Sequence, residues 1–140
     1  MRRQVLRSLL GLAALGWASS TLSATQKAKT EPRLIGTWRS DKERTLALWK
    51  YKNEVSPETR SRIENLFGKF TLRFTRTHIH TEFEGETSSV RYSVIASDKN
   101  SVVIAWHEEE GPSLQHIHFE SESYYVVSGY NVEFFTRVRA

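Results

Sequence analysis

Leu34-Ile35-Gly36-Thr37-Trp38-Arg39 is the stretch that decides the fold of this chain. It reads as the first of a series of short strands. A glycine two residues before a tryptophan lets the backbone bend closely while the indole fills one end of a β structure. We therefore expect Trp38 to be a core residue around which later strands close.

From residue 70 onward, apolar and polar residues alternate with a period of two, which is typical of half-buried strands. Gly85-Glu86 suits a type II′ hairpin turn, because glycine takes the first central position of that turn. This turn would pair Glu84 with Thr87 and set Arg91 opposite His80. The apolar residues of both strands then fall on one face, as a half-buried sheet requires.

Two later connections, 98–100 and 129–131, read as three-residue hairpin loops, and 121–122 as a two-residue turn. Tyr125 and Phe135 would then pair on the outer face, beside Val127 and His118. The cross-strand pairs predicted on the inner face are Tyr92 with Trp106, Val94 with Ile104, Ala96 with Val102, Phe119 with Tyr124, Ile117 with Val126, and Val126 with Phe134.

The fold class predicted from these patterns is mostly β: an antiparallel up-and-down barrel of eight or nine strands. One helix is predicted at about residues 57–67, packed on the barrel as a lid or brace, with Ser56 as its N-cap and Pro57 at its first position. The stretch Thr45–Tyr51 is expected to be a strand or extended cover.

Residues 1–24 have the layout of a secretory signal peptide: early arginines, a short apolar run and small residues before Ala24. We expect cleavage after Ala24, with Ala18 as the alternative, and export by either the Sec or the twin-arginine route. Residues 25–33 read as a flexible leader and 34–140 as the barrel domain. The mature protein is expected to be periplasmic or secreted, soluble, and without membrane association after cleavage.

The charge balance argues against nucleic-acid binding. The chain has 20 Lys and Arg residues against 16 Asp and Glu, but three of the arginines and none of the acids lie in the predicted signal peptide. The mature part is therefore nearly neutral and lacks the basic stripe that such binding needs. The absence of cysteine excludes disulfides and thiol chemistry.

The motif Gly36-Thr37-Trp38, the string of hairpins and Arg137 in the last strand together resemble the lipocalin (calycin) superfamily in its broad sense. The resemblance implies that Trp38 plugs the closed end of the barrel and that Arg137, or Arg139 in its place, packs over the indole. It supplies no ligand residues. The early helix departs from the lipocalin layout and is nearer to that of fatty-acid-binding proteins.

Two His-x-His motifs are the sharpest chemical feature, because residues i and i+2 of a strand share a face and could offer two imidazoles to one metal ion. They comprise His78, His80, His116 and His118. Both pairs alternate with core residues, so we expect surface histidines, with a metal-dependent activity as the minority interpretation. No nucleophile motif is recognisable, and we expect neither an enzyme nor a cofactor.

The function predicted from the sequence is binding of a small apolar or aromatic ligand in the barrel interior, with Tyr92, Trp106 and Tyr124 as lining residues. A packed interior without a ligand is the competing interpretation. The alternative function is a non-catalytic module that binds a protein partner through its outer face at Tyr125 and Phe135.

Overall fold

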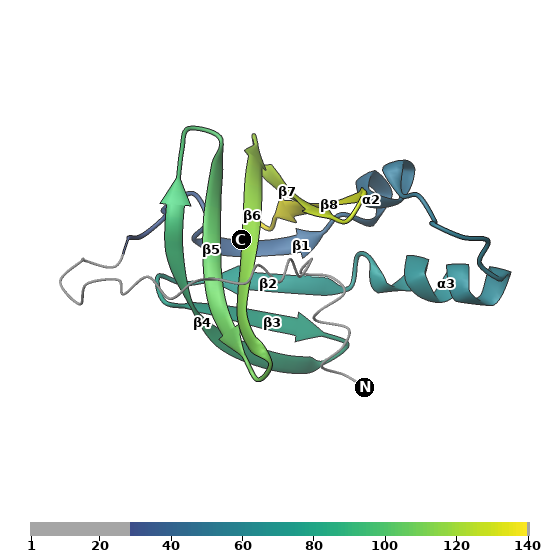
Figure 1. The fold of residues 1–140 in the computed structure, drawn as a ribbon, viewed down its shortest axis with the longest axis horizontal. Coiled ribbons are helices and arrows are strands. Elements are labelled where there is room, and N and C mark those ends of the chain that lie inside the picture. Colours follow the sequence, from purple (N-terminus) through teal and green to yellow (C-terminus); the bar gives the residue numbers. More distant parts are fainter. Residues whose placement is uncertain (1–28, 140) are drawn as a thin grey trace.

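The computed structural model describes residues 29–139, which form a closed antiparallel barrel of eight strands in sequential order with two short helices (Figure 1). The predicted signal peptide and the first part of the leader lie outside the described residues. The elements are β1 (Gly36–Ser40), α2 (Lys42–Leu48), α3 (Pro57–Leu66), β2 (Phe70–Phe74), β3 (His78–Phe83), β4 (Glu86–Ser97), β5 (Ser101–Glu108), β6 (Gly111–Glu120), β7 (Ser123–Ser128) and β8 (Asn131–Arg137).

The barrel closes at β1, which pairs with β2 on one side and with β8 on the other. Trp38 lies opposite Leu72 of β2 and opposite Arg137 of β8. The predicted up-and-down barrel is therefore confirmed, with eight strands. Because successive strands alternate in direction, α2, α3 and the turns β3–β4, β5–β6 and β7–β8 all lie at one end, which we call the helix end.

Two helices occupy the β1–β2 connection, whereas one was predicted. The stretch expected as strand or extended cover is in part α2, which begins after Asp41, whose carboxylate caps it by accepting from the backbone N–H of Arg44. Thr45 of this helix is fully buried, and its hydroxyl accepts a hydrogen bond from the backbone N–H of Phe134 at 3.0 Å. The helix therefore docks on the outer face of β8, which accounts for its apolar side.

The predicted helix is α3, and it starts as expected with Ser56 as N-cap and Pro57 at its first turn. None of its residues is buried, and only Ile63 and Leu66 are both apolar and partly covered. Ile63 packs against the core, and Phe67 just after the helix is buried. α3 projects from the helix end (Figure 1) and contacts the core through Ile63.

The β3–β4 turn differs from the predicted one. Glu84 and Gly85 occupy its two central positions with φ of 49° and 80°, as a type I′ turn requires, and Phe83 pairs with Glu86. Every residue of β3 therefore meets a partner two positions earlier than predicted. A shift of two preserves the alternation of faces, so the core stays the same, but Arg91 lies opposite His78 and not His80.

The β4–β5 pairing is confirmed for Tyr92 with Trp106 and for Val94 with Ile104. Beyond Val94 the register shifts at a β-bulge, so Ala96 lies opposite Val103 and not Val102. The bulge inserts one extra residue into β4, which period-two counting does not anticipate. In the β6–β7 hairpin, Phe119 pairs with Tyr124 as predicted.

The β7–β8 hairpin has a different register from the predicted one, and this difference changes which residues of β8 face the interior. Ser128 pairs with Asn131 across a two-residue turn, so Val126 lies opposite Glu133 and not Phe134. A slip of one residue exchanges the two faces of a strand. Phe135 therefore points inward and is buried, and the predicted outer pair of Tyr125 and Phe135 is wrong: Tyr125 pairs with Phe134.

Candidate functional site in the barrel interior

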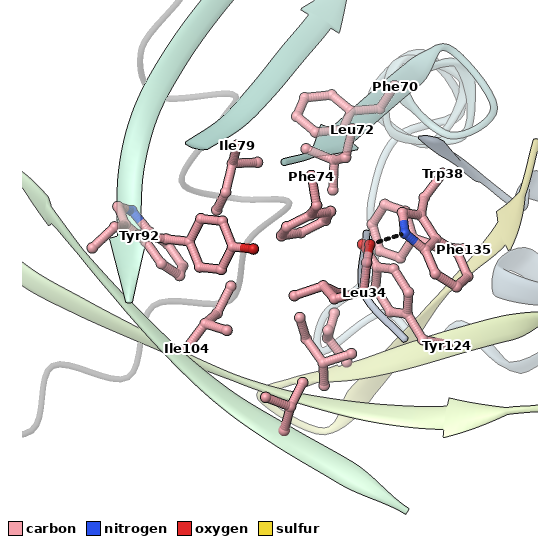
Figure 2. Close-up of a cluster of buried hydrophobic side chains, with 14 of the residues drawn as sticks. Leu34, Trp38, Phe70, Leu72, Phe74, Ile79, Tyr92, Ile104, Tyr124 and Phe135 are labelled. Atoms are coloured by element: carbon pink, nitrogen blue, oxygen red, sulfur yellow. Dashed lines mark hydrogen bonds between the residues drawn. The ribbon is translucent and has the colours of Figure 1, made fainter. Parts of the chain in front are cut away.

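The interior around Trp38 is tightly organised by the residues that carried the lipocalin resemblance. The Arg137 guanidinium carbon lies 4.2 Å from the centroid of the indole and donates hydrogen bonds to the carbonyls of Ile35 and Arg33. The Trp38 indole N–H donates to the carbonyl of Leu34 at 2.9 Å (Figure 2). Arg139, the alternative cation, instead pairs with Glu122.

Gly36 is required by this arrangement. Its φ is +135°, in a region that residues with a Cβ avoid, and a Cβ built there would lie 2.5 Å from Nη1 of Arg137. The glycine thus leaves the space through which the arginine reaches the indole. The motif Gly36-Thr37-Trp38 and Arg137 form one structural unit, as the resemblance implied.

The predicted ligand residues are all buried in one hydrophobic core, but they do not all lie side by side. Tyr92 and Trp106 are cross-strand neighbours on β4 and β5, and their polar atoms already have partners: the Tyr92 hydroxyl donates to the Thr75 carbonyl, and the Trp106 indole to Glu108. Tyr124 lies on the other side of the interior (Figure 2). It stacks on Phe135 at 4.8 Å between centroids.

A glutamate in the interior is the feature that sequence reasoning missed. Glu133 of β8 is 1% exposed, and neither of its carboxyl oxygens has a hydrogen-bond partner. Burial raises the pKa of this carboxyl to about 8, because the charged form loses its hydration. Glu133 is therefore mostly protonated at pH 7 in the barrel as it stands.

Gln115 of β6 carries the other unpaired polar atom found inside the described part of the chain. Its side chain is buried, its amide nitrogen donates to the carbonyl of His116, and its Oε1 has no partner. Gln115 lies on the inward face of β6 two residues before Ile117, and Glu133 follows the same inward face of β8. Both open acceptors thus belong to the interior wall.

The signal that would have revealed Glu133 is the pair Phe134-Phe135. Consecutive residues of a strand point to opposite faces, so only one of these rings can be inside. If Phe135 points inward, Glu133 also points inward, because it lies two residues earlier on the same strand. Phe134 is then left outside, where α2 covers it: the Arg44 guanidinium carbon lies 4.2 Å from the centroid of the Phe134 ring.

The histidine pairs lie on separate parts of the outer face. The rings of His116 and His118 on β6 are 4.0 Å apart, and those of His78 and His80 on β3 are 6.0 Å apart. Strands β4 and β5 lie between the two pairs, so the four imidazoles do not converge. Among residues 29–139 there is no group of three or more His, Cys, Asp or Glu side chains arranged to hold a metal ion.

Burial and nearby cations disfavour protonation of one histidine in each pair. The pKa of His118 is lowered by burial and by His116, and its ring stacks on Tyr125 at 4.8 Å. The pKa of His80 is lowered by partial burial, by Arg73 and by His78. The histidines of each pair contact each other on the outer surface of the sheet, and His118 also contacts Tyr125.

No helix in the described part of the chain is long and apolar enough to cross a membrane. The chain matches no protein-family model, no curated protein and no solved structure.

Proposed function

We propose that this protein is an exported, lipocalin-like carrier that binds a small ligand with an apolar or aromatic body in its barrel interior. An eight-stranded barrel is just wide enough to hold one such ligand or to be filled by side chains. The inward wall here is largely apolar and aromatic, with Tyr92, Trp106 and Tyr124 among its rings. The observation that carries the proposal is the unpaired carboxyl of Glu133.

A barrel that only packs its own core has no use for this carboxyl. An unsatisfied buried polar group costs about 1 to 3 kcal/mol, and an apolar side chain of similar size would avoid that cost. Unsatisfied buried groups in native structures usually have a specific explanation, such as a catalytic role, strain, or an ordered water or ion. We take Glu133 in a largely apolar wall as support for ligand binding over a simply filled core.

The assignment to the lipocalin superfamily in its broad sense rests on the unit formed by Gly36, Trp38 and Arg137. It is supported by the barrel's strand order and by the guanidinium packed on the indole. Export to the periplasm or outside the cell is proposed from the signal-peptide layout of residues 1–24. A carrier in such a compartment would meet small molecules arriving from outside.

Native mass spectrometry of the protein purified from its own host, compared with the denatured protein, tests the proposal. We expect additional mass that is lost on denaturation. Displacement of the fluorescent probe N-phenyl-1-naphthylamine locates the site. Val126→Phe should weaken probe binding because Val126 faces the interior, and Val127→Phe should not, because Val127 is exposed on the same strand. Absence of extra mass on the purified protein, together with absence of probe binding, would reject ligand binding.

A second candidate, binding of a protein partner through the outer surface, is favoured by three exposed apolar side chains at the helix end. Leu48, Val127 and Tyr130 are 60%, 50% and 56% exposed. Leu48 ends α2, Val127 is near the end of β7 and Tyr130 lies in the β7–β8 turn, so all three belong to that end of the molecule. A protein without bound ligand in the first experiment would make this the leading proposal.

A further inference from the structure

The interior presents unpaired hydrogen-bond acceptors. The three buried side-chain oxygens without partners in the described chain are the two of Glu133 and Oε1 of Gln115. Two donors on the interior wall already have acceptors: the Tyr92 hydroxyl donates to the Thr75 carbonyl and the Trp106 indole donates to Glu108. A complementary ligand must therefore supply donors.

We propose that the interior ligand carries a primary amine, which sits as an ammonium group on the Glu133 carboxylate with Gln115 Oε1 as a second acceptor. This rests on the proposed ligand binding and names its chemical class: a small aromatic or apolar amine. An ammonium group has three N–H donors and no acceptor, so it matches a site made of oxygens. Its charge also allows the buried carboxyl to ionise.

Cations of the protein do not compete for this place. Arg137 lies four residues further along β8, at the opposite end from the helices, and both of its terminal nitrogens donate to backbone carbonyls. Arg44 is outside the barrel, on Phe134 and paired with Glu120 at 2.8 Å. No ion pair forms at Glu133 within the described residues. A cationic ligand would thus be the partner that the carboxylate lacks.

Acidic residues gather in two hairpins at the helix end. The β3–β4 and β5–β6 turns at this end carry five glutamates, of which Glu84 pairs with Lys69 at 3.2 Å: Glu84, Glu86, Glu108, Glu109 and Glu110. Glu133 enters the barrel from the same end, two residues after Asn131. α2 and α3 at this end also carry cations, among them Lys42, Arg60 and Arg62, so the charge of the helix end is mixed and the proposal rests on the carboxyl of Glu133 itself.

Isothermal titration calorimetry with matched probes tests the proposal. The amines run from benzylamine to 4-phenylbutylamine, and the corresponding alcohols are neutral controls of the same shape. We expect the best amine to bind at least about ten-fold more tightly than its alcohol, the usual strength of a hydrogen bond to a charged group. Glu133→Gln should bring amine and alcohol to within about three-fold of each other. Gln115→Leu should weaken amine binding by a smaller factor, as expected for a single neutral acceptor.

Glu122→Gln is the matched control, because it makes the same carboxyl-to-amide change at an exposed residue that pairs with Arg139. It should leave the preference for amines intact. Equal binding of amines and alcohols by the unaltered protein, or a preference that survives Glu133→Gln, would overturn the amine proposal while leaving ligand binding in place. If no probe binds and the purified protein carries no extra mass, both the amine proposal and the proposed ligand binding are rejected.

Discussion

Glu133 lies directly opposite Val126 across the last hairpin, and this pairing puts a carboxyl group inside the barrel. In the other register of the same hairpin, Phe134 would be inside and Glu133 in solvent. Phe135 then would lose its stacking contact with Tyr124. The observed register thus forms an aromatic contact and also buries an unpaired acid. Glu133 is therefore the residue whose substitution should have the most measurable consequences.

The stability of the protein should fall as pH rises from about 4.5 to about 8. The folded-state pKa of Glu133 is raised to about 8 from an ordinary value of 4.5, so across this window the unfolded chain releases a proton that the folded state keeps. Below pH 4.5 both states hold the proton and nothing is lost. The full penalty is on the order of 4 to 5 kcal/mol above pH 8.

Urea titrations at pH 5 and pH 8.5 measure this penalty. Glu133→Gln cannot titrate, so the free energy of unfolding of this variant should exceed that of the unaltered protein by more at pH 8.5 than at pH 5. Glu122→Gln should track the unaltered protein at both pH values. A stability difference that does not change with pH would show that Glu133 titrates normally.

Most of the architecture could be predicted from the sequence, because period-two alternation fixes which residues face inward as long as each register is correct. The β3–β4 turn was placed one position late, but that error moved every pairing by two and left the core unchanged. The β7–β8 turn was read as three residues and not two, and that error moved the pairing by one. It hid Glu133 and misplaced Phe135.

α2 was missed for a different reason. Its sequence carries a good N-cap in Asp41, but Thr45, Leu46 and Trp49 fit a strand as well as a short helix. The choice is made by tertiary contacts that no local pattern contains: Thr45 accepts from Phe134, 89 positions away, and Asn131 bonds the backbone of Lys50. Polar atoms without partners in the interior are likewise visible only once the registers are known.

Trp38→Ala should lower the free energy of unfolding by about 3 to 5 kcal/mol, the usual loss for truncating a buried tryptophan. The indole is 1% exposed, contacts Tyr124 edge-on at 4.7 Å and carries Arg137 on its face. Denaturant titration measures this loss, provided that the slope of the unfolding free energy against denaturant concentration is the same for both proteins. Trp49→Ala is the comparison, because Trp49 is only partly buried and should cost less. A loss below about 1 kcal/mol for Trp38→Ala would contradict the plug role.

Gly36→Ala should be more destabilising than Gly111→Ala, although the two glycines have similar φ of +135° and +127°. Both substitutions strain the backbone, but only the Cβ at Gly36 meets another group, Nη1 of Arg137 at 2.5 Å; nothing lies within 4 Å of the one at Gly111. We expect an extra cost of about 1 to 3 kcal/mol, typical of overpacking.

A double-mutant cycle separates the clash from the strain. In an Arg137→Leu background the guanidinium is gone, so the added methyl group at position 36 should cost no more than at position 111. Thermal or urea unfolding of the four proteins gives the coupling energy between Gly36 and Arg137. Additive losses would mean that the arginine moves aside freely.

Binding of an amine at pH 7 should release close to one proton per site. Glu133 is protonated in the ligand-free barrel, with a pKa of about 8, and must ionise to pair with an ammonium group. Tyr124 is the other titratable group influenced by Glu133, and burial raises its pKa further above its ordinary value, so it stays protonated throughout. Calorimetric enthalpies measured in phosphate and in Tris buffer should therefore differ by the difference between the two buffer ionisation enthalpies. Glu133→Gln should abolish that buffer dependence, and a neutral alcohol probe should show none with either protein.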